Sequence, residues 1–118
     1  MVDISIENEK LVVALAGMDK LWALKSRLEV PLSNISSVRA DPEITAKQGH
    51  TGLKITGARL GERMIAGSFQ QHGDSVFWDV HDATKAIVIE LHDEHYAELI
   101  LEVNDPESTV NTIKAAIS

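Results

Sequence analysis

The chain of 118 residues contains no cysteine. This absence excludes disulfide bonds, cysteine-ligated zinc sites, iron–sulfur clusters and thiol nucleophiles. Long apolar runs are missing too, because none approaches the roughly 18 residues of a membrane-spanning helix. Residues 1–7 carry acids where a secretory signal carries lysine or arginine. We therefore expect a cytoplasmic protein with a single domain, residues 1–118, which needs no metal or disulfide to fold.

Positive charge is scarce in the second half of the chain. Residues 74–107 contain ten acids and one lysine, a net charge of −9, within a total of −7. Residues 1–73 contain eight acids and nine bases, a net charge of +1. Nucleic acids and anionic membranes are bound mainly through lysine and arginine. We therefore expect no nucleic-acid partner and no strong binding to anionic membranes.

Apolar residues alternate with polar ones in several short stretches of the first half, which is typical of strands with one buried face. The pattern predicts two strands around a tight turn at Asn8 and Glu9, a third that ends near Pro31, and a fourth that starts at Ile35. Residues 18–25 have helical spacing and predict one or two turns of helix. Residues 41–63 show no period and contain four glycines, so we predict a long loop there.

The second half shows a clearer pattern, with four apolar stretches separated by short polar links. The stretches are centred on residues 64–71, 76–80, 87–91 and 99–103. Because the links are too short for crossover helices, we expect an antiparallel meander. Asp105 and Pro106 are typical of a helix start, and Val110, Ile113 and Ile117 then form one apolar stripe. The sequence thus predicts an α+β domain with an antiparallel sheet and a C-terminal helix.

Several short motifs together resemble a family of uncharacterised bacterial proteins, the pleckstrin-homology-like (PH-like) group. They are Gly57-Ala58-Arg59, Ala66-Gly67-Ser68-Phe69, Phe77-Trp78-Asp79-Val80, Ala86-Ile87-Val88-Ile89-Glu90-Leu91 and Glu102-Val103-Asn104-Asp105-Pro106. The resemblance covers about half of the chain, residues 57–113. It implies a bent antiparallel sheet of about seven or eight strands, in two packed halves, capped by the C-terminal helix. Gly61-Glu62 departs from the Pro-Gly pair expected in one turn, and no functional site carries over from the family.

Two groups of histidines and carboxylates are candidate metal or catalytic sites. The turn His92-Asp93-Glu94-His95 has metal-ligand residue types, but the helical spacing that would make its histidines converge is absent. Asp79 and His81 share a strand face, so a hydrolase could combine them with Ser68 or Ser75. No nucleophile elbow accompanies them. We expect no metal, no cofactor and no catalytic residues.

Two further features point to binding rather than catalysis. His50, Lys54, Arg59 and Arg63 lie in the glycine-containing 41–63 segment and could bind a small anion. Phe77 and Trp78 are adjacent, so one should be core and the other, Phe77, could mark a partner surface or a dimer contact.

The first functional hypothesis is therefore a non-enzymatic PH-like module that binds a protein partner, or a second copy of itself, through main-chain pairing at a sheet edge. The alternative is a binder of small ligands or anions that uses the 41–63 loop. A hydrolase that uses Asp79 and His81 comes third.

Overall fold

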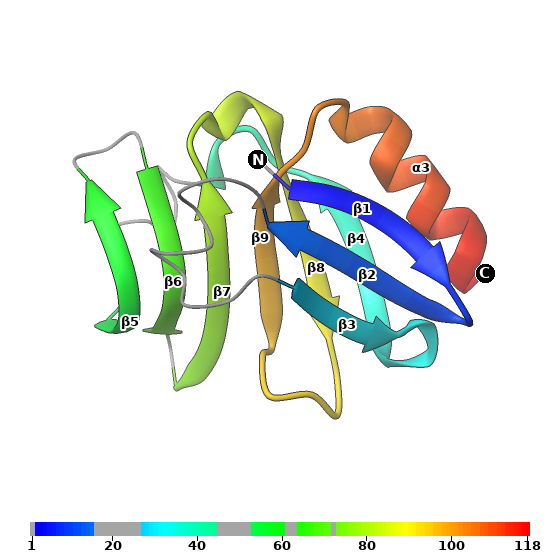
Figure 1. The fold of residues 1–118 in the computed structure, drawn as a ribbon, viewed down its shortest axis with the longest axis horizontal. Helices are drawn as coiled ribbons and strands as arrows, with labels where there is room; N and C mark the ends of the chain where they lie inside the picture. The colour runs from blue at the N-terminus through cyan, green and yellow to red at the C-terminus, as the bar shows by residue number, and fades with distance from the viewer. Residues whose placement is uncertain (1, 16–26, 45–52, 61–63, 72) are drawn as a thin grey trace.

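The structure is a computed structural model that describes residues 2–15, 27–44, 53–60, 64–71 and 73–118. Within these ranges nine strands form two sheets, and an α-helix follows the last strand (Figure 1). The fold class is α+β, as predicted. The helical turns predicted for residues 18–25 lie outside the described residues.

The smaller sheet contains three antiparallel strands in the order β1–β2–β3. They span Val2–Glu7, Lys10–Leu15 and Arg27–Pro31. Asn8 and Glu9 connect the first two strands with φ angles of 51° and 63°. A two-residue hairpin turn requires this left-handed geometry, so the predicted tight turn is confirmed. The prediction that the third strand ends near Pro31 is confirmed as well.

The larger sheet contains six strands in the order β4–β8–β9–β7–β6–β5. From β4 to β9 they span Ile35–Ala40, Leu53–Leu60, Met64–Gln71, Asp74–Val80, Ala86–Leu91 and Glu98–Glu102. The predicted meander is wrong at one step, because β9 lies between β7 and β8 and pairs in parallel with β7. The link from β7 to β8 contains the short 3-10 helix η2 (Ala83–Lys85). It can pass one intervening strand because neighbouring strands lie only about 5 Å apart.

Strand β5 occupies residues 53–60, so the predicted loop over 41–63 is wrong for this segment. The register with β6 shifts between Lys54 and Thr56, which marks a β-bulge. A bulge interrupts the two-residue alternation by which a strand is recognised in a sequence. In addition, Gly57 lies opposite Gly67, so this part of the strand has no apolar side chain to reveal it.

Both faces of the larger sheet are buried at its strands β7, β8 and β9. Phe77 belongs to a core cluster that combines residues of both sheets and the C-terminal helix, whereas Trp78 belongs to a second cluster on the opposite face. The two side chains are 0% and 1% exposed. Trp78 is a core residue, as predicted. Phe77 is not the outward-facing aromatic that we expected, because the second face of β7 is covered too.

The C-terminal helix α3 spans Pro106–Ile117, as predicted. The Asp105 carboxylate accepts the backbone N–H of Ser108 at 3.1 Å, which satisfies one of the free donors of the first turn. Val110 and Ile113 are buried and Ile117 is partly buried, all within the cluster between the sheets. The helix packs against β4, β8 and the short 3-10 helix η1 (Leu32–Asn34).

Candidate partner-binding edge

The basic residues proposed as an anion site are not gathered by any described contact. His50 and Arg63 lie outside the described residues. Lys54 and Arg59 belong to β5, where the backbone is described and the side chains are not. The anion site therefore stays a prediction, and its loop is shortened by an eight-residue strand.

Asp79 and His81 differ sharply in their surroundings. Asp79 is 0% exposed within β7, whereas His81 is exposed just beyond the end of that strand. Ser68 does not join them: its hydroxyl lies 2.6 Å from the Tyr96 hydroxyl. Ser75 uses its carbonyl to accept the backbone N–H of Ala97 at 2.8 Å. The described contacts of the two serines are therefore with Tyr96 and Ala97.

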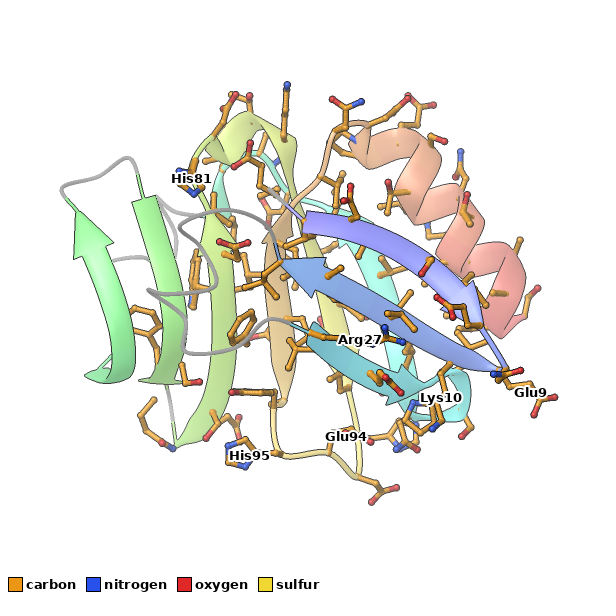
Figure 2. All side chains as sticks on the ribbon, in the orientation of Figure 1. Glu9, Lys10, Arg27, His81, Glu94 and His95 are labelled. Atoms are coloured by element: carbon orange, nitrogen blue, oxygen red, sulfur yellow. The ribbon has the colours of Figure 1, made fainter. Side chains whose placement is uncertain are left out.

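The turn 92–95 lies at the opposite end of the larger sheet from His81, as Figure 2 shows for Glu94 and His95. Its side chains have separate partners. Nδ1 of His92 lies 3.1 Å from the Asp93 carboxylate, the Glu94 carboxylate accepts a hydrogen bond from the amide of Asn34, and the ring of His95 meets Tyr96 edge-on at 4.7 Å between centroids. In the part of the chain that the structure describes, no three histidine or carboxylate side chains are placed to hold a metal ion.

Tyr96 joins this turn to the core, which the sequence did not reveal. It is 8% exposed and its ring lies 5.5 Å from that of Phe77 between centroids. Its hydroxyl contacts Ser68 on β6 at 2.6 Å. Tyr96 lies within a short polar link, where a turn is the ordinary expectation, so no periodic signal marked it as a core residue.

Glu102 was also missed as a structural residue. It is 5% exposed, and one carboxylate oxygen accepts the backbone N–H groups of His81 at 2.8 Å and Asp82 at 3.2 Å. The Glu102 carboxylate on β9 therefore fixes the start of the link that crosses β9 from β7 to β8. The N–H of Val103 donates to the carbonyl of Lys85 at 3.1 Å, which fixes the other end of the same link.

Asp82 stabilises this link through local hydrogen bonds. Its carboxylate accepts hydrogen bonds from the Thr84 hydroxyl at 2.6 Å and the Thr84 backbone N–H at 3.0 Å. The side-chain bond first, then the backbone bond, lowers the pKa of Asp82 from the ordinary aspartate value. Because the folded-state pKa lies below the unfolded one, the ionised group stabilises the fold above about pH 4. This contribution is lost as the pH falls through the folded-state pKa.

We expect Thr84→Val to raise the pKa of Asp82 partway towards the ordinary aspartate value, because the side-chain bond is removed and the backbone bond is kept. NMR titration of the Asp82 carboxyl carbon measures the midpoint. Thr112→Val, on the outer side of α3, is the matched control and should leave that midpoint unchanged. An identical Asp82 midpoint in wild type and Thr84→Val contradicts the assignment.

Two hollows on the described surface are open to solvent. One lies on the outer side of α3 at Ser108, Asn111 and Thr112, and the other lies between the β1–β2 turn and η1, at Lys10 and Ser33. Lys10, which lines the second hollow, is labelled in Figure 2. Neither hollow contains a histidine, and both are shallow surface depressions, unlike the enclosed pockets that bury a small ligand.

The free edges of the two sheets remain as binding features, and β3 is a poor one. The N–H of Leu32 donates to the carbonyl of Glu9 at 3.0 Å, one step beyond the β2–β3 ladder. By alternation, the nitrogen of Pro31 is directed to the free edge, where it offers no donor. Arg27 and Glu29 pair at 2.8 Å on the same strand. A proline and a neutralised charge pair are features that discourage strand addition.

The edges at β1 and β4 are close to the helix. Helix α3 packs directly against β4, which also carries a register shift between Ile35 and Ser37. Val2 and Ile4 of β1 share a core cluster with Val110 and Ile113 of α3. A helix that covers an edge and a bulge within it both restrict pairing with another chain.

Strand β5 forms the other edge of the larger sheet. With eight residues it is the longest of the four edge strands, since β1 and β4 have six and β3 has five. Figure 1 shows β5 in green at the end of the larger sheet, away from the smaller sheet and from α3. Among the described residues, no strand pairs with its outer side. Unpaired N–H and C=O groups along such an edge can bind another extended chain.

No protein-family model, curated protein or solved structure matches this chain. In the described ranges no helix combines the length and the apolar character needed to cross a lipid bilayer.

Proposed function

We propose that this chain is a non-enzymatic, PH-like protein-binding module that recognises an extended segment of its partner by main-chain pairing along β5. The observation that carries the proposal is an eight-residue strand at the end of the larger sheet, whose outer side pairs with no other strand of the described residues. The motifs that resemble the PH-like family are consistent with a binding role, although folds of this kind serve many functions. A cytoplasmic location stays a prediction.

Strand addition suits this edge for a physical reason. Every second residue of an added strand exchanges hydrogen bonds with the edge, and these bonds do not depend on the identity of the partner's side chains. The register between Thr56 and Leu60 is continuous with β6, so this part of β5 offers a regular template. The bulge next to Lys54 limits how far a partner strand can extend.

No comparable observation on the described residues supports the other two hypotheses. The small-anion hypothesis depends on a loop that is interrupted by β5 and on His50 and Arg63, which lie outside the described residues. The hydrolase hypothesis depends on Asp79 and His81, and Ser68 contacts Tyr96 instead. Both stay untested predictions.

The test compares Ile55→Pro with Ile55→Ala, after selection of binders from a random eight-residue peptide library on the wild-type protein. Ile55 is the residue that the β5–β6 register skips, and proline is tolerated at bulges but blocks pairing at an edge. We expect selected peptides to bind Ile55→Ala as they bind wild type, and Ile55→Pro at least about tenfold more weakly, a loss of about 1.4 kcal/mol.

Bound peptide should also slow amide hydrogen exchange in residues 53–60 and not in β3. Urea unfolding of both variants establishes that each is folded. A library that yields no binder, or binders that are indifferent to Ile55→Pro, would overturn the proposal.

A further inference from the structure

The charge of the candidate edge differs in sign from that of the whole chain. Strand β5 has the sequence LKITGARL, with Lys54 and Arg59 and no acid, and β6 has the sequence MIAGSFQQ, with no charged residue. These two strands therefore carry +2 in a chain with a net charge of −7, so the rest of the chain carries −9.

The positive charge at this edge is not balanced by neighbouring strands. The only strand that pairs with β5 among the described residues is the uncharged β6. The next strand, β7, carries Asp74 and Asp79, two strand spacings or about 10 Å away. Opposite charges on an added strand would lie at half that distance.

A second copy of β5 is a poor partner for this edge. Antiparallel pairing of two β5 strands about their common centre places Lys54 opposite Arg59, twice in the dimer. Like charges that face each other across a strand pair are destabilising. Two chains that each carry −7 also repel one another at long range.

We infer that β5 selects an acidic extended segment of a different protein. The juxtaposition that carries the inference is an unpaired edge, two basic residues on it, and an uncharged strand behind it. The inference rests on the proposed function, because it specifies the partner of the same edge. Main-chain pairing provides the docking geometry, and opposite-charge pairs across the new ladder provide the selectivity.

Three synthetic eight-residue peptides test it by fluorescence anisotropy: alternating valine with glutamate, with glutamine, or with lysine. We expect the glutamate peptide to bind about tenfold more tightly than the glutamine peptide at low ionic strength, through two favourable cross-strand charge pairs. The lysine peptide should bind more weakly than either. The advantage of the glutamate peptide should disappear near 1 M salt, where the screening length is about 3 Å.

Two double variants and one modified peptide test whether the charge preference arises at β5 and whether binding needs main-chain pairing. Lys54→Glu combined with Arg59→Glu should reverse the preference, so that the lysine peptide binds best. Lys10→Glu combined with Lys114→Glu changes the net charge equally at other elements and should preserve the preference for glutamate. Methylation of alternate backbone nitrogens of the glutamate peptide keeps its charge, removes donors, and should abolish binding.

The outcomes separate the inference from the proposed function. Glutamate and glutamine peptides of equal affinity, both sensitive to methylation, would overturn the acidic partner and leave edge pairing intact. Binding of the glutamate peptide that survives methylation would overturn both, since charge alone would explain it. A concentration-dependent dimer in sedimentation that Ile55→Pro abolishes and Ile55→Ala preserves would overturn the inference in favour of a second copy.

Discussion

Replacement of Trp78 by alanine is expected to lower the free energy of unfolding by about 3–5 kcal/mol, the usual cost of removing a large buried aromatic side chain. Trp78 is 1% exposed and belongs to the core cluster on the face of the larger sheet that is turned away from the smaller sheet. If one face of the sheet were solvated, one of the two adjacent aromatic residues would be exposed. Its replacement by alanine would then lower the free energy of unfolding much less. Urea unfolding followed by circular dichroism measures the change.

Phe77→Ala should produce a loss of similar size, because Phe77 is 0% exposed in the cluster on the other face. The control is Ile6→Ala, which removes a large apolar side chain that is 37% exposed and should cost less than about 1 kcal/mol. A loss below about 1 kcal/mol for Trp78→Ala or Phe77→Ala would contradict burial of both faces of β7.

The second large effect is expected for Glu102→Leu, which should destabilise the protein by about 2–4 kcal/mol. The leucine fills a similar volume but leaves the N–H groups of His81 and Asp82 without the carboxylate that accepts them at 2.8 and 3.2 Å. Hydrogen bonds to a charged group contribute about 1.5–3 kcal/mol each, and water can replace part of this contribution because His81 and Asp82 are exposed residues. Urea unfolding measures the loss.

Glu90→Leu is the matched control, because Glu90 lies on the neighbouring strand β8 and pairs with Arg39 while 45% of its side chain is exposed. An exposed ion pair contributes at most about 1 kcal/mol. Glu102→Gln keeps one oxygen acceptor and should fall between wild type and Glu102→Leu. Equal losses for Glu102→Leu and Glu90→Leu would contradict the role of Glu102 in holding the link.

The local elements were largely predictable, because each has a local cause. The hairpin around Asn8 and Glu9 follows from two apolar alternations separated by two turn residues. The helix follows from Asp105, Pro106 and a stripe of apolar residues three and four apart. These signals depend on neighbours in the sequence, so they survive without knowledge of the tertiary fold.

The order of the strands was not predictable from the same signals. The alternation of apolar and polar residues indicates which residues of a strand share a face, but it does not indicate which strands are neighbours in the sheet. The stretch Ala86–Leu91 did contain one clue, since a nearly continuous apolar strand is typical of a sheet that is covered on both faces. The insertion of β9 between β7 and β8 has no counterpart in sequence periodicity.

The site was less predictable than the fold. The features that make β5 a candidate, its terminal position and its free outer side, are properties of the assembled sheet. The bulge beside Lys54 and the pairing of Gly57 with Gly67 concealed the strand itself. Glu102 appeared only as one acid among ten in an acidic stretch, because nothing local shows that its carboxylate reaches two backbone groups some twenty residues away.

The central position of β9 also constrains how the protein is made. It is the last of the described strands in chain order, and it supplies the ladder partner of both β7 and β8. Before β9 is synthesised, the strands of the larger sheet form two separate pieces: β4 paired with β8, and β5 paired with β6 and β7. The edges of β8 and β7 that β9 later joins have no partner strand. Completion of the sheet must therefore await the synthesis of Glu98–Glu102, and contacts between distant parts of the chain make such topologies slow to fold.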